Sequence, residues 1–224
     1  MGMGFPKGGV EFLRDLAEHN NRDWFQANRK RYEQELKEPA KRLAEAIAGI
    51  LKKVDRRHAG DPAKAVSRIN RDIRFSKDKA PYYSRVWFSF PLATGERQAG
   101  AAYYVGIDTD DAGTGAGCWE PPPERMGTLR AKIAKQHVAL RKIVDDPKFR
   151  KRFGDVEGNA YKRVPKPFPP DHPAGDLLKL KGVHVHGKVP LKVATSGGFL
   201  DVVAEDFRLL APMVAFLDKG LSAG

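Results

Sequence analysis

The most distinctive chemistry in this sequence lies in one short basic segment. Three arginines fall within seven residues there. A guanidinium group is a planar fork of N–H donors that matches the oxygens of phosphate or carboxylate. Three such groups exceed what one or two nearby carboxylates neutralise, so the segment predicts a preorganised anion site. The side chains assigned to this site are Arg68, Arg71, Arg74, Ser76, Lys77, Lys79 and Tyr82.

Apolar and polar residues alternate from Val66 to Phe75, which predicts a half-buried strand. Because successive side chains of a strand point to opposite faces, Ile69, Ile73 and Phe75 are expected on the core face. Arg71 falls among them. An alternative interpretation is a lattice of salt bridges that fixes this strand against the N-terminal helices, and many such surface pairs contribute little to stability. The sequence leaves the anion site and the lattice equally open.

Two carboxylates and one tryptophan are candidates for chemistry beside the basic segment. Asp72 or Glu120 is a candidate catalytic base, with the arginines stabilising developing negative charge. In the alternative interpretation both carboxylates are ion-pair partners only. Trp119 either stacks on a planar ligand at the rim of a cleft or caps the core. The core is favoured, because large aromatic side chains mostly serve burial.

Histidine and cysteine residues give little support for a metal centre. His184 and His186 lie two residues apart, so a strand would present both imidazoles on one face to a metal ion. A third ligand is missing nearby unless Asp171 or His172 folds back, so exposed histidines are favoured and no metal or cofactor is predicted. Cys118 is the only cysteine, which excludes an intramolecular disulfide and any multi-cysteine cluster. We expect it to be a buried thiol.

Three glycines, Gly113, Gly115 and Gly117, alternate with other residues in a way that resembles a nucleotide-binding loop. The dinucleotide fingerprint requires glycine where Cys118 stands, and a helix must follow. Neither condition is met. The glycines are therefore expected to form a bend or bulge between strands, followed by a short fourth strand at 118–120.

The composition is that of an ordinary globular protein with a strong positive charge. The chain has 224 residues, with 40 Lys and Arg, 28 Asp and Glu, and a formal net charge of +12. This charge is compatible with nucleic acid, phosphorylated metabolites or an acidic protein as a partner, and it selects none of them. No secretory signal and no apolar run of membrane-spanning length is present. A cytoplasmic protein without a membrane partner is expected, and the oligomeric state is left open.

Hydrophobic periodicity predicts helices at 8–55, strands at 66–120 and mainly helices at 123–218. Pro39 removes a backbone donor, so a kink or break is expected near Lys37–Pro39. Further strands are expected at 85–92, 101–108 and 183–189, and the clearest helix spans 199–217. Short connections favour an antiparallel meander. The chain is thus expected to form one α+β domain over residues 1–224, with an antiparallel sheet flanked by N-terminal and C-terminal helices.

Several motifs occur in an order that resembles one protein family. They are Asn20–Phe25, Arg68–Tyr82, Gly115–Pro121, Phe153–Gly154, Asp171–Pro173 and Leu177–Lys181. Together they resemble the family "domain of unknown function 2461", over about residues 5–217. The resemblance implies a protein of a mostly bacterial and fungal family and assigns no activity. The chain departs from the family pattern at Tyr83, where lysine is usual, and at Gly182–Gly187, where an aromatic and then a basic segment are usual.

Three functions follow from these observations, and the sequence does not decide whether the protein is an enzyme. The first is a basic cleft for a small anionic ligand, with hydrolysis or group transfer on a phosphorylated or carboxylated substrate as the natural reaction. The second is a nucleic-acid-binding or adaptor module without catalysis. It requires a contiguous basic face with exposed aromatic residues for stacking. In the third, the charged segment only supports the fold.

Overall fold

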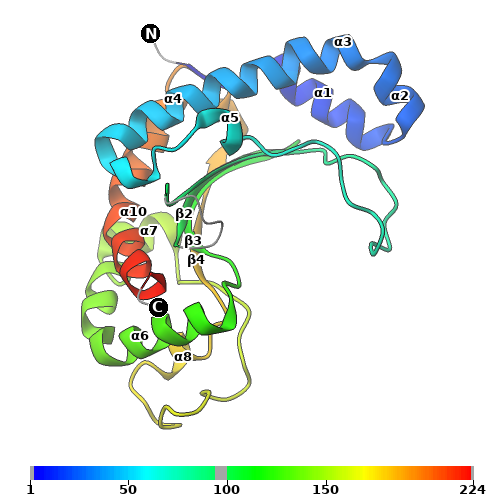
Figure 1. Ribbon diagram of the computed structural model, residues 1–224. Helices are drawn as coiled ribbons and strands as arrows, with labels where there is room; N and C mark the ends of the chain where they lie inside the picture. The colour runs from blue at the N-terminus through cyan, green and yellow to red at the C-terminus, as the bar shows by residue number, and fades with distance from the viewer. Residues whose placement is uncertain (1–2, 94–99, 223–224) are drawn as a thin grey trace.

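The computed structural model describes residues 3–93 and 100–222. Within these ranges four strands form one antiparallel sheet in the order β1-β2-β3-β4. The strands are β1 Val86–Pro91, β2 Ala102–Ile107, β3 Asp111–Cys118 and β4 Val183–Pro190. N-terminal and C-terminal helices flank this sheet (Figure 1). The predicted α+β class is therefore confirmed.

The N-terminal third of the chain is helical. Its elements are α1 Lys7–Glu18, α2 Arg22–Ala27, α3 Arg29–Arg31, the π-helical segment η1 Tyr32–Lys37, α4 Glu38–Val54, the 3-10 turn η2 Arg56–His58 and α5 Pro62–Ala65. Asn21 caps α2 by accepting a hydrogen bond from the backbone N–H of Trp24, as its short polar side chain predicts. The expected irregularity near Pro39 is confirmed, because π-helical turns precede α4 and Pro39 lies in its first turn.

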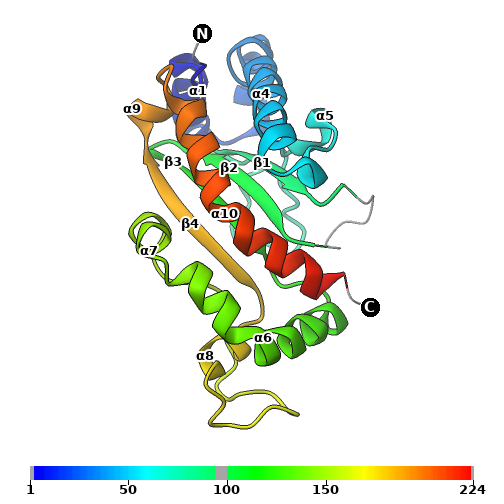
Figure 2. The same cartoon turned by 90° about the vertical axis from the view of Figure 1, so that its left-hand side faces the viewer.

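The C-terminal half supplies five helices in the described residues. They are α6 Pro123–Val144, α7 Pro147–Phe153, α8 Gly175–Leu178, α9 Leu191–Ala194 and α10 Phe199–Leu221. Helix α10 lies across one face of the sheet, as Figure 2 shows. None of the helices in the described parts of the chain is long and apolar enough to cross a membrane.

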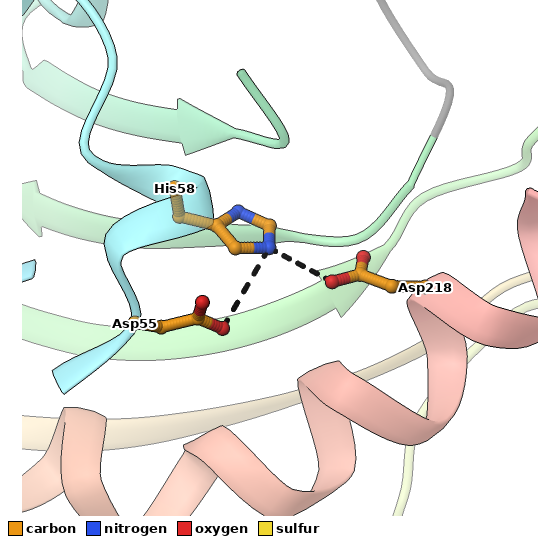
Figure 3. A group of neighbouring side chains, drawn as sticks. All are labelled: Asp55, His58 and Asp218. Carbon is orange, nitrogen blue, oxygen red and sulfur yellow. Dashed lines mark hydrogen bonds and ion pairs between the residues drawn. The ribbon is translucent and has the colours of Figure 1, made fainter. Parts of the chain in front are cut away.

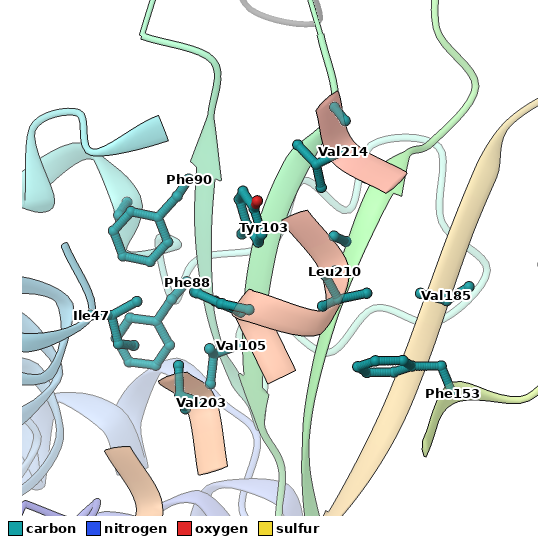
Figure 4. Close-up of a cluster of buried hydrophobic side chains, with 14 of the residues drawn as sticks. Ile47, Phe88, Phe90, Tyr103, Val105, Phe153, Val185, Val203, Leu210 and Val214 are labelled. Carbon is teal, nitrogen blue, oxygen red and sulfur yellow. The ribbon is translucent and has the colours of Figure 1, made fainter. Parts of the chain in front are cut away.

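The core lies between the sheet and the helices α4 and α10. Alternate residues of each strand point into it, and Figure 4 shows them packed against both helices. The contributors drawn include Ile47, Phe88, Phe90, Tyr103, Val105, Val185, Val203, Leu210 and Val214. All of these side chains are buried, and each large apolar one contributes about 1.5–3 kcal/mol to folding. One face of the sheet therefore packs into the core, and the side chains of the other face are not part of it.

The segment predicted as a strand at 66–75 is not a regular strand. It is one limb of a projecting loop, residues 67–85, which we call the basic arm (Figure 1). Only isolated bridges pair it, at Val66 with Phe88 and at Asn70 with Tyr82. Phe75, expected in the core, is 95% exposed. The prediction failed because the segment folds back on itself before it can follow the edge of the sheet.

The base of the basic arm is fixed to the N-terminal helices. Asn20 donates from Nδ2 to the carbonyl of Tyr82 at 3.0 Å and accepts from the Tyr82 N–H at 3.1 Å. The Tyr82 ring stacks on Phe25 with 4.1 Å between ring centroids. These contacts hold the base of the arm against the N-terminal helical region, while Phe75 farther along the arm is exposed.

The glycines of the alternating motif lie inside β3 and not in a bend between strands. β3 runs from Asp111 to Cys118, so Trp119 and Glu120 follow the strand and do not belong to it. Both predictions for this region, the bend and the strand at 118–120, are therefore wrong. The reason is that rings from the neighbouring strands β2 and β4 lie against Gly115 and Gly113, where a larger side chain would overlap them.

Candidate functional site

The face of the sheet that points away from α4 and α10 is the candidate functional site, and we call it the open face. It is the concave side of the curved sheet in Figure 1. Because side chains alternate along a strand, the residues between the core positions point to it. On β1 and β2 they include Trp87, Ser89 and Tyr104, and on β4 they include His184 and His186.

Glycines form the floor of the open face. Gly106 pairs with Gly113, and Gly115 pairs with Tyr104 across the β2–β3 ladder. A Cβ at Gly115 would overlap the Tyr104 ring, and one at Gly113 would overlap the His186 ring. The absence of side chains at these positions lets rings from neighbouring strands lie flat on the sheet.

Aromatic rings form a continuous row across this floor. The ring centroids of Trp87 and Tyr104 are 6.0 Å apart, those of Tyr104 and Trp119 5.0 Å, and those of Trp119 and His184 4.0 Å. The Tyr104 hydroxyl donates a 2.6 Å hydrogen bond to the carbonyl of Val185, which holds its ring in place. Trp119 is 55% exposed, so the favoured prediction that it caps the core is wrong. It stacks on His184 above the sheet and presents a free surface to solvent.

Guanidinium groups extend this row into the basic arm. Arg85 lies over both neighbouring rings, at 5.7 Å from the Trp87 centroid and 5.8 Å from that of Tyr83. Arg71 also lies over Tyr83, at 5.7 Å from the ring centroid. Such contacts hold a cation over a ring without neutralising its charge. We call this series the cation–ring row: Arg71, Tyr83, Arg85, Trp87, Tyr104, Trp119 and His184. Cations and rings alternate as far as Trp87, and rings alone continue from there.

Ion pairs inside the arm occupy two of the three arginines of the predicted anion site. Arg71 pairs with Asp78 and also contacts the Ser76 hydroxyl at 3.4 Å. Arg74 donates two hydrogen bonds to Asp72, at 3.0 and 2.7 Å. These bonds hold the pKa of Asp72 below its usual value, so the carboxylate is ionised at pH 7 and pairs with Arg74 at the surface.

The rest of the predicted anion site faces solvent or the arm itself. Lys79 donates to the carbonyl of Ile73 at 3.2 Å, while Arg68 and Lys77 are exposed. Tyr82 is buried at the root of the arm. These side chains do not converge on one pocket in the described residues, but they leave the arm strongly positive. From residue 64 to 85 the chain carries seven basic residues, namely Lys64, Arg68, Arg71, Arg74, Lys77, Lys79 and Arg85, against Asp72 and Asp78.

Three hollows follow the cation–ring row along the open face. A central hollow of about 540 Å³ is lined by Trp87, Tyr104, Trp119 and Lys64. A small hollow of about 120 Å³ lies on the arm side of Trp87, beside Arg85 and His186. An acidic hollow of about 470 Å³ lies beyond Trp119. The two tryptophans are thus the walls between successive hollows.

Polar groups line the acidic hollow. They are Glu120, Glu157, Asn159 and His184. The Asn159 amide donates to Glu120 Oε1 at 2.7 Å, and Glu157 Oε2 lies 4.0 Å from His184 Nε2. Burial lowers the pKa of His184, so its imidazole is neutral at pH 7. Sequence reasoning missed Glu157 and Asn159, because they belong to a Gly- and Pro-rich excursion without recognisable periodicity.

A second group of titratable residues is buried on the core side of the sheet, where His58 lies between Asp55 and Asp218 (Figure 3). His58 Nδ1 is 3.0 Å from the carbonyl oxygen of Phe90, and Nε2 is 3.0 Å from Asp218 Oδ2. The three side chains could hold a metal ion by geometry. Arg57 already pairs with both carboxylates, at 2.7 Å and 3.2 Å. We therefore interpret the group as a polar staple between α4 and α10.

The histidine pair and the cysteine singled out in the sequence show neither a set of three metal ligands in the described residues nor an ionised thiol. Within the described residues, His184 and His186 form no group of three metal ligands with a neighbouring side chain. Burial raises the pKa of Cys118 to about 11, so it is a protonated thiol at pH 7. The open face therefore offers stacking surfaces, hydrogen-bonding groups and positive charge.

Comparison with known families agrees with the motifs. A family model described as "Conserved hypothetical protein (DUF2461)" matches residues 9–216, and the chain belongs to this family. The resemblance drawn from the sequence is thus confirmed. No curated protein matches the chain. The family description names no activity, so the function has to be argued from the open face.

Proposed function

We propose that this protein binds single-stranded nucleic acid on the open face of its sheet. Bases stack on the exposed rings, and phosphates lie along the basic arm. The observation that carries this proposal is the cation–ring row, in which two guanidinium groups alternate with Tyr83 and Trp87 at the arm end and aromatic rings continue from there across the face. Proteins that bind single strands combine these two elements, because every base has a face that stacks and every nucleotide carries a negative charge.

The central hollow is large enough to take a planar base between the two tryptophans. The central hollow of about 540 Å³ is open to solvent and has the volume of an ordinary ligand pocket. Trp119, 55% exposed, borders this hollow on one side, and Trp87 borders it on the other. A planar group placed there meets rings at both ends, and Arg85 lies next along the row.

A pocket for a small anion within the arm itself is less well supported. Arg71 and Arg74 already hold carboxylates, so a small anion there would compete with Asp78 and Asp72. A polyanion does not need a free pocket, because it gains from the summed field of the arm and from counterion release. In this proposal Arg68, Lys77 and Lys79 contact phosphates, together with the hydroxyl of Ser76.

Fluorescence anisotropy with labelled oligo(U) and oligo(dT) over a range of KCl concentrations tests the proposal. We expect binding that weakens as salt rises. Trp119→Ala should weaken it about 5- to 150-fold, because one stacked base contributes about 1–3 kcal/mol. Arg85→Ala should weaken binding and lower the salt slope by about 0.7. Arg208→Ala, on α10 at the opposite side of the sheet, is the matched control and should bind like the wild type.

Three results would overturn the proposal. The first is an absence of binding at low salt. The second is equal affinity for a duplex of the same length, because stacked and paired bases cannot lie on the rings. The third is unchanged affinity in both Trp119→Ala and Arg85→Ala. Circular dichroism of each variant shows that a loss of affinity does not come from unfolding.

A further inference from the structure

A further hollow lies on the helical side of the sheet, between α7 and α10, and we call it the α7–α10 hollow. Its volume is about 580 Å³, and Figure 2 shows β4 between the two helices. Helix α7 contributes Lys148 and Lys151 to the lining, and α10 contributes Val202, Arg208 and Leu209. None of the residues of the cation–ring row lines it. The hollow is therefore separate from the open face.

A partly buried ion pair forms the deepest part of the α7–α10 hollow. Arg152 Nε and Nη2 donate to the two carboxylate oxygens of Asp206, each at 2.6 Å, and Nη1 donates to the carbonyl of Lys188 at 2.9 Å. Asp206 is 3% exposed. A Cβ at Gly187 would lie 2.6 Å from Arg152 Nη1, so the guanidinium group approaches β4 closely at this glycine. The charges of the pair compensate each other, which leaves binding to the other residues of the lining.

The other basic residues of the lining have no acidic partner. Lys148, Lys151 and Arg208 are exposed, and none of them forms an ion pair within residues 3–93 and 100–222. By contrast, Arg150 on the same helix α7 lies outside the hollow and is paired with a carboxylate. Apart from the ion pair of the deepest part, the lining has only Glu205 to set against these three residues. Three positive charges therefore face one negative charge.

Apolar side chains lie among these charges. Val202 and Leu209 are seven residues apart on α10, so they share one face of the helix, and both are half-buried. An aliphatic group placed over them would remove apolar surface from water. The lining contains no aromatic side chain, so a nucleotide base would find no ring on which to stack. A second copy of the chain is disfavoured, because two molecules with a net charge of +12 repel each other.

We propose that the α7–α10 hollow docks an acidic peptide segment of a partner protein. Aliphatic side chains of the segment cover Val202 and Leu209, and its carboxylates pair with the three unpaired basic residues. The argument for this occupant is charge complementarity, which selects an acidic partner and speeds its encounter with the site. The proposal goes beyond single-strand binding and does not depend on it, because the two sites lie on opposite sides of the sheet.

Selection from a library of random peptides displayed on phage tests the proposal. The intact protein is the bait, and the variant Lys148→Glu/Lys151→Glu is the bait for counter-selection. Peptides that bind only the wild type should carry Asp or Glu beside Leu, Ile or Val. In fluorescence anisotropy, the most enriched peptide should bind the double variant about 10- to 100-fold more weakly, because like charges then meet in the hollow. Its affinity for the wild type should fall as the KCl concentration rises.

Two further variants complete the design. Val202→Thr replaces one methyl group by a hydroxyl group and should weaken binding of the enriched peptide about 4-fold, since about one buried methyl group is lost. Lys52→Glu/Lys53→Glu reverses two exposed charges on α4 outside the hollow, so it changes the net charge equally and is the matched control. It should bind the peptide like the wild type. Circular dichroism shows whether each variant is folded.

Several results would overturn the inference. One is that no peptide is enriched on the wild type over Lys148→Glu/Lys151→Glu, or that the enriched peptides are basic or uncharged. Another is equal peptide affinity in the wild type and this variant. Weaker oligo(U) binding by this variant than by Lys52→Glu/Lys53→Glu would assign the hollow to nucleic acid. A wild-type dimer that this variant loses in analytical ultracentrifugation would assign it to a second copy. Failure of single-strand binding on the open face leaves the peptide result unaffected, so the two proposals are tested separately.

Discussion

Adding one methyl group to the floor of the open face, by Gly115→Ala, should destabilise the protein by about 2–4 kcal/mol. The new Cβ would overlap the Tyr104 ring and also the carbonyl oxygen of Val185. That oxygen is the acceptor of the Tyr104 hydroxyl hydrogen bond. The ring must therefore leave the sheet. Overpacking of this kind costs about 1–3 kcal/mol, and the lost hydrogen bond costs about another 1 kcal/mol.

Urea unfolding followed by far-ultraviolet circular dichroism measures this change in the free energy of unfolding. The matched control is Gly49→Ala in the middle of α4, where the new Cβ would meet no atom within 4 Å apart from its chain neighbours and the backbone of its own helix. It should stabilise the protein by about 0.5–1 kcal/mol, because alanine loses less conformational entropy than glycine in a helix. The reasoning is refuted if Gly115→Ala is as stable as the wild type and single-strand binding is unchanged.

Three further predictions concern the supports of the open face. Asn20→Ala removes both hydrogen bonds between Asn20 and Tyr82 at the base of the basic arm. It should lower the free energy of unfolding by roughly 1–3 kcal/mol and speed hydrogen exchange in the arm. Exchange at the wild-type rate would contradict this. Asp218→Ala removes the acceptor of two buried groups, His58 Nε2 and the Ala101 N–H, and should cost about 2–5 kcal/mol in thermal or urea unfolding. A loss under about 1 kcal/mol would contradict the staple. Burial lowers the pKa of His184 and His186, so the unfolded chain binds more protons below the usual histidine pKa. Their stabilising contribution is present above about pH 6.5 and is lost as the pH falls through the lowered values. NMR titration of the two imidazoles should give pKa values below 6.5, and values above 6.5 would refute the assignment.

The regular elements could be read from the sequence because their periodicity arises from contact with one core. The stripe of α10 and the strands at 86–91, 102–107 and 183–190 lie within a few residues of their predicted bounds. Each of them has one apolar face, and the apolar period alone identifies it. The irregularity before Pro39 was also predictable, since proline removes a backbone donor at a known position.

The basic arm misled sequence reasoning because its alternation does not come from a core. Ile69 is buried, but Phe75 lies at the exposed tip. The same alternation of apolar and polar residues therefore places one apolar side chain in the core and another in solvent. The ion pairs of Arg71 and Arg74 are made within the arm, and only the fold-back brings Asp78 to Arg71. Spacing along the chain could not show this.

The open face was hidden from the sequence for a topological reason. The glycines of β3 are explained by rings on neighbouring strands that lie against them. The Tyr104 ring of β2, for example, lies against Gly115. Likewise, Asp218 reaches His58 across 160 residues. Trp119 was expected in the core because aromatic residues usually are, and its exposure follows from its place just beyond the end of β3. Alternating glycines beside a tryptophan are the one signal that could have indicated a flat, ring-covered sheet.

Photo-crosslinking of the intact protein to a single-stranded oligonucleotide carrying 5-iodouracil tests the central claim most directly. Iodouracil couples to aromatic rings that stack on it, and peptide mapping by mass spectrometry identifies them. Crosslinks at Tyr83, Trp87 and Trp119, suppressed by salt, are the predicted result. Crosslinks confined to the helical side of the sheet, or none at concentrations that saturate binding, would contradict it.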